Sequence, residues 1–253
     1  MSKNEEKPSE NVKKSHNPQI DVLYIVGTGS KFGNEELKYS LRSLQTYVKD
    51  YGRVFITGVC PPFIDKTKVV HTHEQDLDCP MMSHWWKVRQ TIQKTDISNT
   101  FVLMYDDIFF VKPTKLTNYP FYHKELLTDK FGDGIYRKSL TRAAEFLKKE
   151  GRSVCDCELH IPCVYNRILF EKMDSFYLPL IKDPIGMAVR SVYANYFGLV
   201  GPLRGDIKLR TSVDTVEGMI GNADCFSVSD WVYQCDTQRW LKEHFPNKSE
   251  FEK

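Results

Sequence analysis

The sequence predicts one α/β domain with a mostly parallel central sheet flanked by helices. In the first half of the chain, apolar runs typical of buried strands alternate with amphipathic helical patterns, as right-handed β-α-β crossovers require. The chain has 253 residues, 41% of them hydrophobic, and contains no internal repeat or low-complexity linker. We therefore expect a single domain over residues 19–253, preceded by a disordered tail over residues 1–18, which are rich in Lys, Glu, Ser, Asn and Pro.

Composition argues against several classes of protein. The 35 Lys and Arg against 33 Asp and Glu leave a net charge of +2, too small to hold nucleic acid by bulk charge alone. The chain lacks a run of about 18 apolar residues and its start is polar, so we expect no transmembrane segment. We expect a cytoplasmic location, in a bacterium or a virus-infected host cell, with the seven cysteines as thiols. The sequence does not fix the oligomeric state.

The elements of the first half begin with a predicted strand over residues 21–26, an apolar run that ends at the glycine-rich turn 27–30. A helix is expected over residues 34–48, because its leucines recur at intervals of three and four and two glutamates stand in its first turn. Residues 53–57 and 68–71 predict the second and third strands. Together these elements predict a β-α-β unit at the start of the domain.

A second helix is expected to begin with Ser83 as its cap. Residues 101–105 then predict the next buried strand, which ends at Asp106 and Asp107. Residues 108–111 predict a short strand that continues after the two aspartates. The acidic pair is thereby delivered to one edge of the sheet.

The second half is less regular. The apolar spacing over residues 140–147 predicts an amphipathic helix that ends at Gly151. Another helix is expected over residues 165–173, and a final one that Ser229 caps and that runs to Phe245.

The most informative residues are Asp106 and Asp107, which lie between two apolar runs. In open α/β sheets, ligands bind at the carboxyl ends of the strands, where these carboxylates are expected. Two like charges in apolar surroundings oppose each other's ionisation, and a divalent cation relieves that cost while it recruits phosphate oxygens. The alternative is a turn with two solvated aspartates.

The chain resembles glycosyltransferases of the GT-A fold, which carry a short acidic motif after an apolar strand, as Tyr105-Asp106-Asp107 does here. It resembles most closely the Stealth family of sugar-phosphate transferases, which build capsular polysaccharide. The similar segments are residues 20–24, 36–44, 53–58 and 101–110, and His160-Ile161-Pro162 with Tyr165. The resemblance implies a GT-A-like fold over the domain and a nucleotide-activated sugar as donor.

Such a donor needs its diphosphate to be held and neutralised. We expect Asp106 and Asp107 to bind a divalent metal, Mn²⁺ or Mg²⁺, with Asp107 also acting as a catalytic residue. Backbone amides at the end of the first strand are expected to hold the nucleotide, at Gly27, Thr28, Gly29 and Ser30. Cations would stabilise the departing phosphate, and the candidates, each of which could instead be a solvated surface charge, are Lys38, Arg42, Arg190, Arg204, Lys208 and Arg210.

Residues 155–163 hold three cysteines and a histidine, which leaves two interpretations open. In the first, these four side chains bind structural zinc, although a single residue between the first two cysteines is closer than the usual spacing of two to four. In the second, His160 completes the catalytic metal site or contacts phosphate, while Asp156 or Glu158 acts as a base toward the acceptor hydroxyl. A histidine that simply packs in the core is a further alternative.

Together these features predict a metal-dependent glycosyltransferase that moves a sugar from a nucleotide-sugar donor to an acceptor hydroxyl. The acceptor would be a polysaccharide, another glycan or a hydroxymethylated base in DNA. Transfer of a sugar 1-phosphate is the alternative within the same fold. A metal-dependent phosphodiesterase and a non-catalytic module that binds nucleotide or carbohydrate are the alternatives from other classes.

Overall fold

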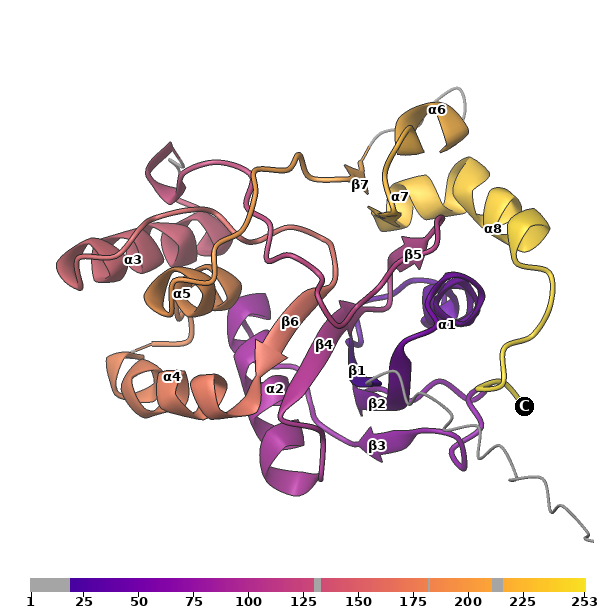
Figure 1. The fold of residues 1–253 in the computed structure, drawn as a ribbon, viewed down its shortest axis with the longest axis horizontal. Coiled ribbons are helices and arrows are strands. Elements are labelled where there is room, and N and C mark those ends of the chain that lie inside the picture. Colours follow the sequence, from indigo (N-terminus) through magenta and orange to yellow (C-terminus); the bar gives the residue numbers. More distant parts are fainter. Residues whose placement is uncertain (1–18, 130–132, 182, 211–215) are drawn as a thin grey trace, which may run out of the picture.

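The computed structural model describes residues 19–129, 133–181, 183–210 and 216–253, so the predicted tail over residues 1–18 lies outside the described part. A five-stranded sheet forms the centre of the molecule (Figure 1). Its strands, in spatial order, are β3 (Val70–Thr72), β2 (Tyr51–Gly58), β1 (Ile20–Val26), β4 (Thr100–Tyr105) and β6 (Cys163–Asn166). All neighbours are parallel except β4 and β6, which confirms the predicted α/β class with a mostly parallel sheet.

The register of the sheet decides where the chemistry lies. Strand β1 is central and pairs with β2 on one side and β4 on the other. Ile25 of β1 stands opposite Tyr105 of β4, so both strands end at the same edge. The turn after β1 and the aspartates after β4 therefore meet there.

A second, three-stranded sheet continues directly from this edge. It consists of β5 (Ile108–Phe110), β8 (Cys225–Val228) and β7 (Lys208–Leu209), in the order β5-β8-β7. Strand β5 pairs antiparallel with β8, and β7 pairs parallel with it, with Lys208 opposite Ser227. This small sheet brings a segment from late in the chain beside the aspartates that precede β5.

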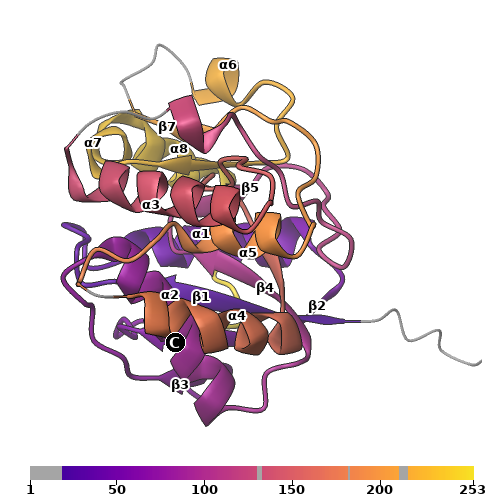
Figure 2. The ribbon, with the colours of Figure 1, turned by 90° about the vertical axis from the view of Figure 1, so that its left-hand side faces the viewer.

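Helices cover both faces of the central sheet (Figures 1 and 2). On one face, Leu23 and Leu103 pack in a core with the helices α2 (Pro80–Lys94), α3 (Ile135–Lys149), α4 (Arg167–Leu180) and α5 (Val189–Tyr196). On the other face, Val22 and Met104 pack against α1 (Glu35–Tyr47) and β5. The alternation of strand side chains thus fills two separate cores.

A third core lies under the small sheet. There Phe109 and Phe226 pack with the elements α6 (Val216–Ile220), α7 (Asp230–Val232), a π-turn (Tyr233–Thr237) and α8 (Gln238–His244). Among the helices that the structure describes, none is long and apolar enough to span a membrane.

Two helix starts differ from the sequence prediction. Helix α2 begins at Pro80 rather than after Ser83, because a proline at the first helical position already has the backbone angle that a helix requires. Ser83 lies inside the helix, where its hydroxyl accepts a hydrogen bond from the Leu77 amide and donates one to the Leu77 carbonyl.

The helix expected over residues 165–173 was wrong at its start, because Tyr165 belongs to strand β6. Helix α4 begins at Arg167, and the Asn166 side chain caps it by accepting a hydrogen bond from the Leu169 amide at 3.1 Å. Ser229 does precede the C-terminal helices, but its side chain makes no capping hydrogen bond.

Candidate active site

Asp106 and Asp107 lie at the carboxyl edge of the central sheet, where β4 ends and β5 has not yet begun. Beside them lies a cavity of about 210 Å³, which we call the first cavity. Its lining residues are Gly27, Gly29, Ser30, Asn34, Glu36, Asp106, Asp107, Lys208, Val228, Ser229 and Asp230. The structure therefore brings together three residues of the predicted glycine-rich turn, both aspartates and one predicted cation.

The lining of the first cavity is rich in acidic residues. Of the described residues that line it, four are acidic and Lys208 is basic. Burial, followed by the charge of Asp107, raises the pKa of Asp106 to about 8, and burial also raises the pKa of Glu36. The raised pKa values mean that ionising these two carboxyl groups costs free energy in the free protein, and a bound cation would reduce that cost.

Three polar atoms in this cavity lack partners. The buried Asn34 Oδ1, Asp107 Oδ1 and Ser229 Oγ have no hydrogen-bond partner among the described residues. Buried polar atoms normally have partners, so such atoms around one cavity are typical of a site that a polar ligand completes. The acceptor atom Asp107 Oδ1 suits a cation or a hydrogen-bond donor.

Two residues that were not predicted from the sequence, Asp76 and Lys87, hold the turn after β1. The Asp76 carboxylate accepts hydrogen bonds from the Thr28 amide at 2.7 Å and from the Thr28 hydroxyl at 2.8 Å. The Lys87 ammonium, 1% exposed, donates to Asp76 and, at 2.9 Å, to the Val26 carbonyl. The Thr28 amide is thus already engaged, which leaves Gly27, Gly29 and Ser30 to line the cavity.

Ser30 and Glu36 fix the far end of this turn. The Ser30 hydroxyl donates to Glu36 at 3.0 Å and accepts from the Asn34 amide at 3.1 Å. Glu36 was expected only as a first-turn residue that favours the helix, yet its buried carboxylate also lines the first cavity.

The fit to a divalent cation is partial. Asp107 offers a buried oxygen without a partner, and the cavity has the charge that a cation requires. Within the described part of the chain, however, no three His, Cys, Asp or Glu side chains are gathered as a metal-binding group. Asp106 and Asp107 would therefore hold a cation together with oxygens of a bound ligand, as Mg²⁺ is commonly held.

The Lys208 ammonium contacts both His160 and Asp107, two of the residues predicted to bind the same metal ion. The His160 Nδ1 lies 3.8 Å from Asp107 Oδ2, and the Lys208 Nζ contacts both, at 3.3 Å and 2.8 Å respectively. Burial, followed by the charge of Lys208, lowers the pKa of His160 to about 2, so its imidazole is neutral and can accept from the lysine. The predicted role of His160 in metal binding stays a prediction.

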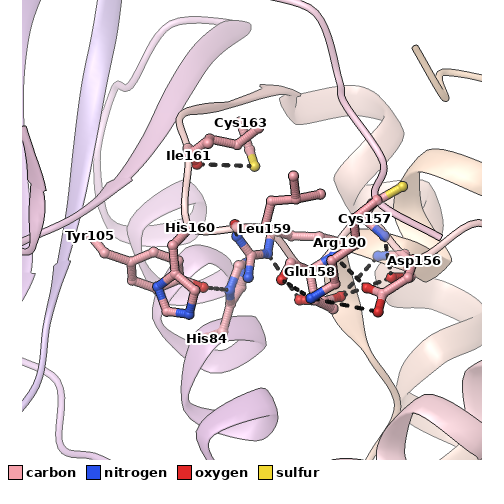
Figure 3. A network of polar contacts seen from close by, with 12 residues as sticks. His84, Tyr105, Asp156, Cys157, Glu158, Leu159, His160, Ile161, Cys163 and Arg190 are labelled. Atoms are coloured by element: carbon pink, nitrogen blue, oxygen red, sulfur yellow. Dashed lines mark hydrogen bonds and ion pairs between the residues drawn. The ribbon is translucent and has the colours of Figure 1, made fainter. Parts of the chain in front are cut away.

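A second cavity, of about 710 Å³, is bordered by His160 and Tyr105. Its walls come from Pro80, Met81, Tyr105, Lys124, Glu125, Tyr136, Arg137, Asp156, Glu158, His160, Arg190, Asp206 and Arg210. Figure 3 shows how the side chains of residues 156–160 gather near Tyr105 and Arg190. The lining contains four acidic and four basic residues, so its formal charges balance.

The two predicted bases line the second cavity but are already engaged. Glu158 forms a buried ion pair with Arg190 at 2.9 Å, with side chains 1% and 3% exposed (Figure 3). Asp156 is fully buried, accepts a hydrogen bond from the Glu158 amide and lies 3.7 Å from the Lys124 ammonium. Both carboxylates are therefore neutralised within the fold.

Asp206 was not selected from the sequence, because it stands within the basic stretch 204–210. Its side chain is 18% exposed and lines the second cavity, and it accepts a hydrogen bond from the His160 amide at 3.3 Å. Burial opposes its ionisation, but His160, Lys124 and Arg210 together lower its pKa. Asp206 is thus an ionised, partly exposed carboxylate beside His160, and it pairs with Arg210 at 3.3 Å.

Tyr105 lines the second cavity and contacts a buried histidine. His84 Nδ1 lies 2.5 Å from the Tyr105 hydroxyl, and its Nε2 lies 3.2 Å from the Tyr165 hydroxyl. Burial, followed by the charge of Arg190, lowers the pKa of His84 well below its usual value, so the ring is neutral. The Arg190 guanidinium stacks over the Tyr105 ring at 5.2 Å.

Of the six predicted phosphate-binding cations, three lie at the cavities. Lys208 lines the first cavity, while Arg210, 62% exposed, and Arg190, which is buried and paired with Glu158, line the second. Arg204 lines neither, because its guanidinium pairs with Asp224 at 2.5 Å and donates to the Tyr119 hydroxyl.

The remaining two cations lie on helix α1 and do not line either cavity. Lys38 pairs with Glu35 at 3.4 Å. Arg42 binds Glu252 through both its Nε and Nη2 at 2.7 Å, which ties the helix to the C-terminal segment. Helical spacing placed them on one face of the helix, but that face packs against the end of the chain.

The cysteines of residues 155–163 do not gather around His160. The Cys157 thiol faces the Cys155 carbonyl at 3.8 Å, and the Cys163 thiol faces the Ile161 carbonyl at 3.5 Å. Among the described residues, none of these side chains belongs to a group of three potential metal ligands.

A parallel sheet with an antiparallel edge strand, an acidic motif at its carboxyl edge and a small second sheet beside that motif define the GT-A class of fold. Solved structures of the galactosyltransferase LgtC share this fold with the chain. The complex of LgtC with donor and acceptor sugar analogs gives a TM-score of 0.54 at 9% identity, covering 91% of this chain and 98% of that one. A structure of an active-site mutant of LgtC gives a TM-score of 0.51 at the same identity and coverage.

No protein-family model matches the chain, and no curated protein matches it significantly. The structural likeness supports the GT-A part of the resemblance and does not single out the Stealth family.

Proposed function

We propose that the protein is a glycosyltransferase that moves a sugar from a nucleotide-sugar donor to an acceptor hydroxyl. The observation that carries this proposal is the acidic first cavity, with its unpartnered Asp107 oxygen, at the edge where β1 and β4 end. The likeness of the fold to a galactosyltransferase solved with donor and acceptor sugar analogs supports it.

The first cavity suits the diphosphate of the donor. Gly27, Gly29 and Ser30 bring backbone close to it, and Lys208 adds one positive charge. Asp106 and Asp107 would hold Mn²⁺ or Mg²⁺ there, and the ion would supply neutralisation of the leaving diphosphate. The protein's own part is to orient the donor and to exclude water around the anomeric carbon.

The second cavity suits the acceptor, because it adjoins the first through His160 and Lys208. Its balanced charges and its tyrosines favour a neutral, hydroxyl-rich glycan over a polyanion such as modified DNA. If transfer requires a base, Asp206, which is 18% exposed and pairs with the exposed Arg210, is more accessible to the acceptor hydroxyl than the buried Glu158 or Asp156.

The proposal is tested by incubating the protein with a panel of nucleotide sugars and Mn²⁺ and measuring thermal stabilisation, followed by transfer to a panel of glycans. We expect one donor to stabilise the fold. The mass of the product then separates transfer of a sugar from transfer of a sugar 1-phosphate, which adds a phosphate as well.

Asp107→Asn is expected to lower turnover by at least about a hundredfold, because it removes charge where the leaving diphosphate departs. Asp96→Asn is the matched control, since the Asp96 side chain is 80% exposed and pairs only with Arg53 among the partners described. Full turnover by a folded Asp107→Asn variant would rule out the proposed chemistry, and stabilisation without turnover by any donor would point to a binding module.

A further inference from the structure

Lys208 occupies the position between Asp107 and His160 where a metal ion would be expected to bind. Its ammonium lies 2.8 Å from Asp107 Oδ2 and 3.3 Å from His160 Nδ1, and its side chain is 14% exposed. An ammonium has three N–H donors, so Lys208 can contact the carboxylate oxygen and the imidazole nitrogen at the same time. The lysine thus serves as the positive charge of the site in the free protein.

The rest of the site leaves room for a second positive charge. Asp107 uses only Oδ2 for the lysine, while its Oδ1 is buried without a partner among the described residues. Lys208 offsets one of the four acidic residues that line the first cavity. A further positive charge in the cavity would favour the ionised forms of these carboxyl groups.

The backbone of Lys208 is fixed, but its side chain can move. Strand β7 is held to β8 at Ser227 and Val228, and the Ser229 amide donates to the Leu209 carbonyl at 3.0 Å. Four rotatable bonds link that backbone to the ammonium, which borders the open volume of the first cavity. The ammonium can leave Asp107 for a ligand in that cavity without any change in the fold.

We propose that Lys208 exchanges partners: it neutralises Asp107 in the free protein and moves to the donor's diphosphate when Asp107 holds a divalent cation. This inference rests on the proposed function, in that the first cavity is taken to bind a diphosphate. Removing the lysine should strengthen the binding of the cation, with which the ammonium competes for Asp107. It should weaken the binding of the diphosphate, which the ammonium would contact.

The test uses the full chain, Mn²⁺ alone and inorganic pyrophosphate, with binding measured by calorimetry. Lys208→Met is expected to bind Mn²⁺ on the order of tenfold more tightly than the wild type, since the competing ammonium is gone. With Mn²⁺ saturating, the same variant is expected to bind pyrophosphate on the order of tenfold more weakly. Lys208→Gln serves as a second variant if the first does not fold, as judged by its thermal unfolding.

The matched control is Lys49→Met, because the Lys49 side chain is exposed, donates to the Gln45 carbonyl at 2.7 Å and lines neither cavity. It should leave both affinities within about twofold of the wild type. Unchanged or weaker Mn²⁺ binding by Lys208→Met, unchanged pyrophosphate binding, or equal effects in the control would each overturn the exchange. Neither probe contains a sugar, so this result stands apart from the outcome of the donor panel.

Discussion

Glu158 and Arg190 form an ion pair in the wall of the second cavity. Both side chains are almost fully buried, and Glu158 also accepts a hydrogen bond from the Ser191 amide at 3.0 Å. Removing one charge of a buried pair leaves the other without compensation. We expect Glu158→Gln to lower the free energy of unfolding by about 3 kcal/mol, measured by urea denaturation at neutral pH.

Glu171→Gln provides the comparison, because Glu171 pairs with Arg167 on the surface at 3.2 Å and its side chain is 53% exposed. An exposed pair of this kind is worth about 0.5 kcal/mol or less. Equal losses in the two variants would contradict the structural role assigned to Glu158 and would make it a candidate base again.

Single residues also mark the limit of what the sequence could predict at the site. Asp106 and Asp107 could be found because two carboxylates between apolar runs form a local pattern. Asp76 and Lys87 could not, because they act on the turn after β1 from segments 48 and 61 residues further along the chain. Asp206 was missed for a different reason, since its basic neighbours dominate the local pattern.

At the scale of elements, the end of β2 supports the end of β1 through a glycine. Gly58 has φ of +105°, and a Cβ at this position would lie 2.0 Å from the Val26 carbonyl oxygen and 2.9 Å from the Lys87 Nζ. Gly58→Ala would therefore strain the backbone and displace the Val26 carbonyl and the Lys87 ammonium, which support the turn that lines the first cavity. We expect a loss of at least about 2 kcal/mol in unfolding free energy and weaker binding of Mn²⁺ with pyrophosphate.

Gly134→Ala is the control for this change, since a Cβ there meets no atom within 4 Å and the residue lies in the extended region at φ of −64°. Its stability should stay within about 0.5 kcal/mol of the wild type in the same denaturation experiment. A Gly58→Ala variant as stable as Gly134→Ala would show that the two strand ends are less tightly coupled than the structure indicates.

The elements that were predicted well are those whose own sequence carries the whole signal. Strands β1 and β4 are apolar runs bounded by Gly27 and Asp106, and helix α3 ends where Gly151 adopts φ of +64°. Tyr165 was misplaced because an apolar residue before a helix fits either element. Its assignment to β6 depends on pairing with Phe101 of β4, which no local pattern records.

At the scale of the whole molecule, the two sheets contribute different residues to the lining of the first cavity. The central sheet supplies Asp106 and Asp107 from one strand end and the glycine-rich turn from another, while the small sheet supplies Lys208 and Val228 from late in the chain. Because β5 starts directly after the aspartates and pairs with β8, a rigid connection joins the two sheets. The position of Lys208 is therefore set by the pairing of distant strands, which the sequence does not reveal.

The charge of the whole molecule bears on the choice between a glycan and modified DNA as acceptor. The net charge is +2, and the second cavity carries as many acidic as basic residues. A protein that binds duplex DNA through many phosphate contacts loses affinity steeply as salt rises, because each contact releases a counterion. With Arg204 already paired to Asp224, little of the predicted basic group is available for phosphates.

We therefore expect duplex DNA that contains hydroxymethylated bases to bind with a dissociation constant weaker than about 100 µM at physiological salt. The slope of log affinity against log salt is expected to be flatter than about −2, measured by fluorescence anisotropy between roughly 50 and 200 mM salt. A neutral oligosaccharide that serves as acceptor should bind with no salt dependence at all. Tight DNA binding with a slope of about −5 or steeper would instead mean that the acceptor is a nucleic acid, and that cations outside the second cavity contact its backbone.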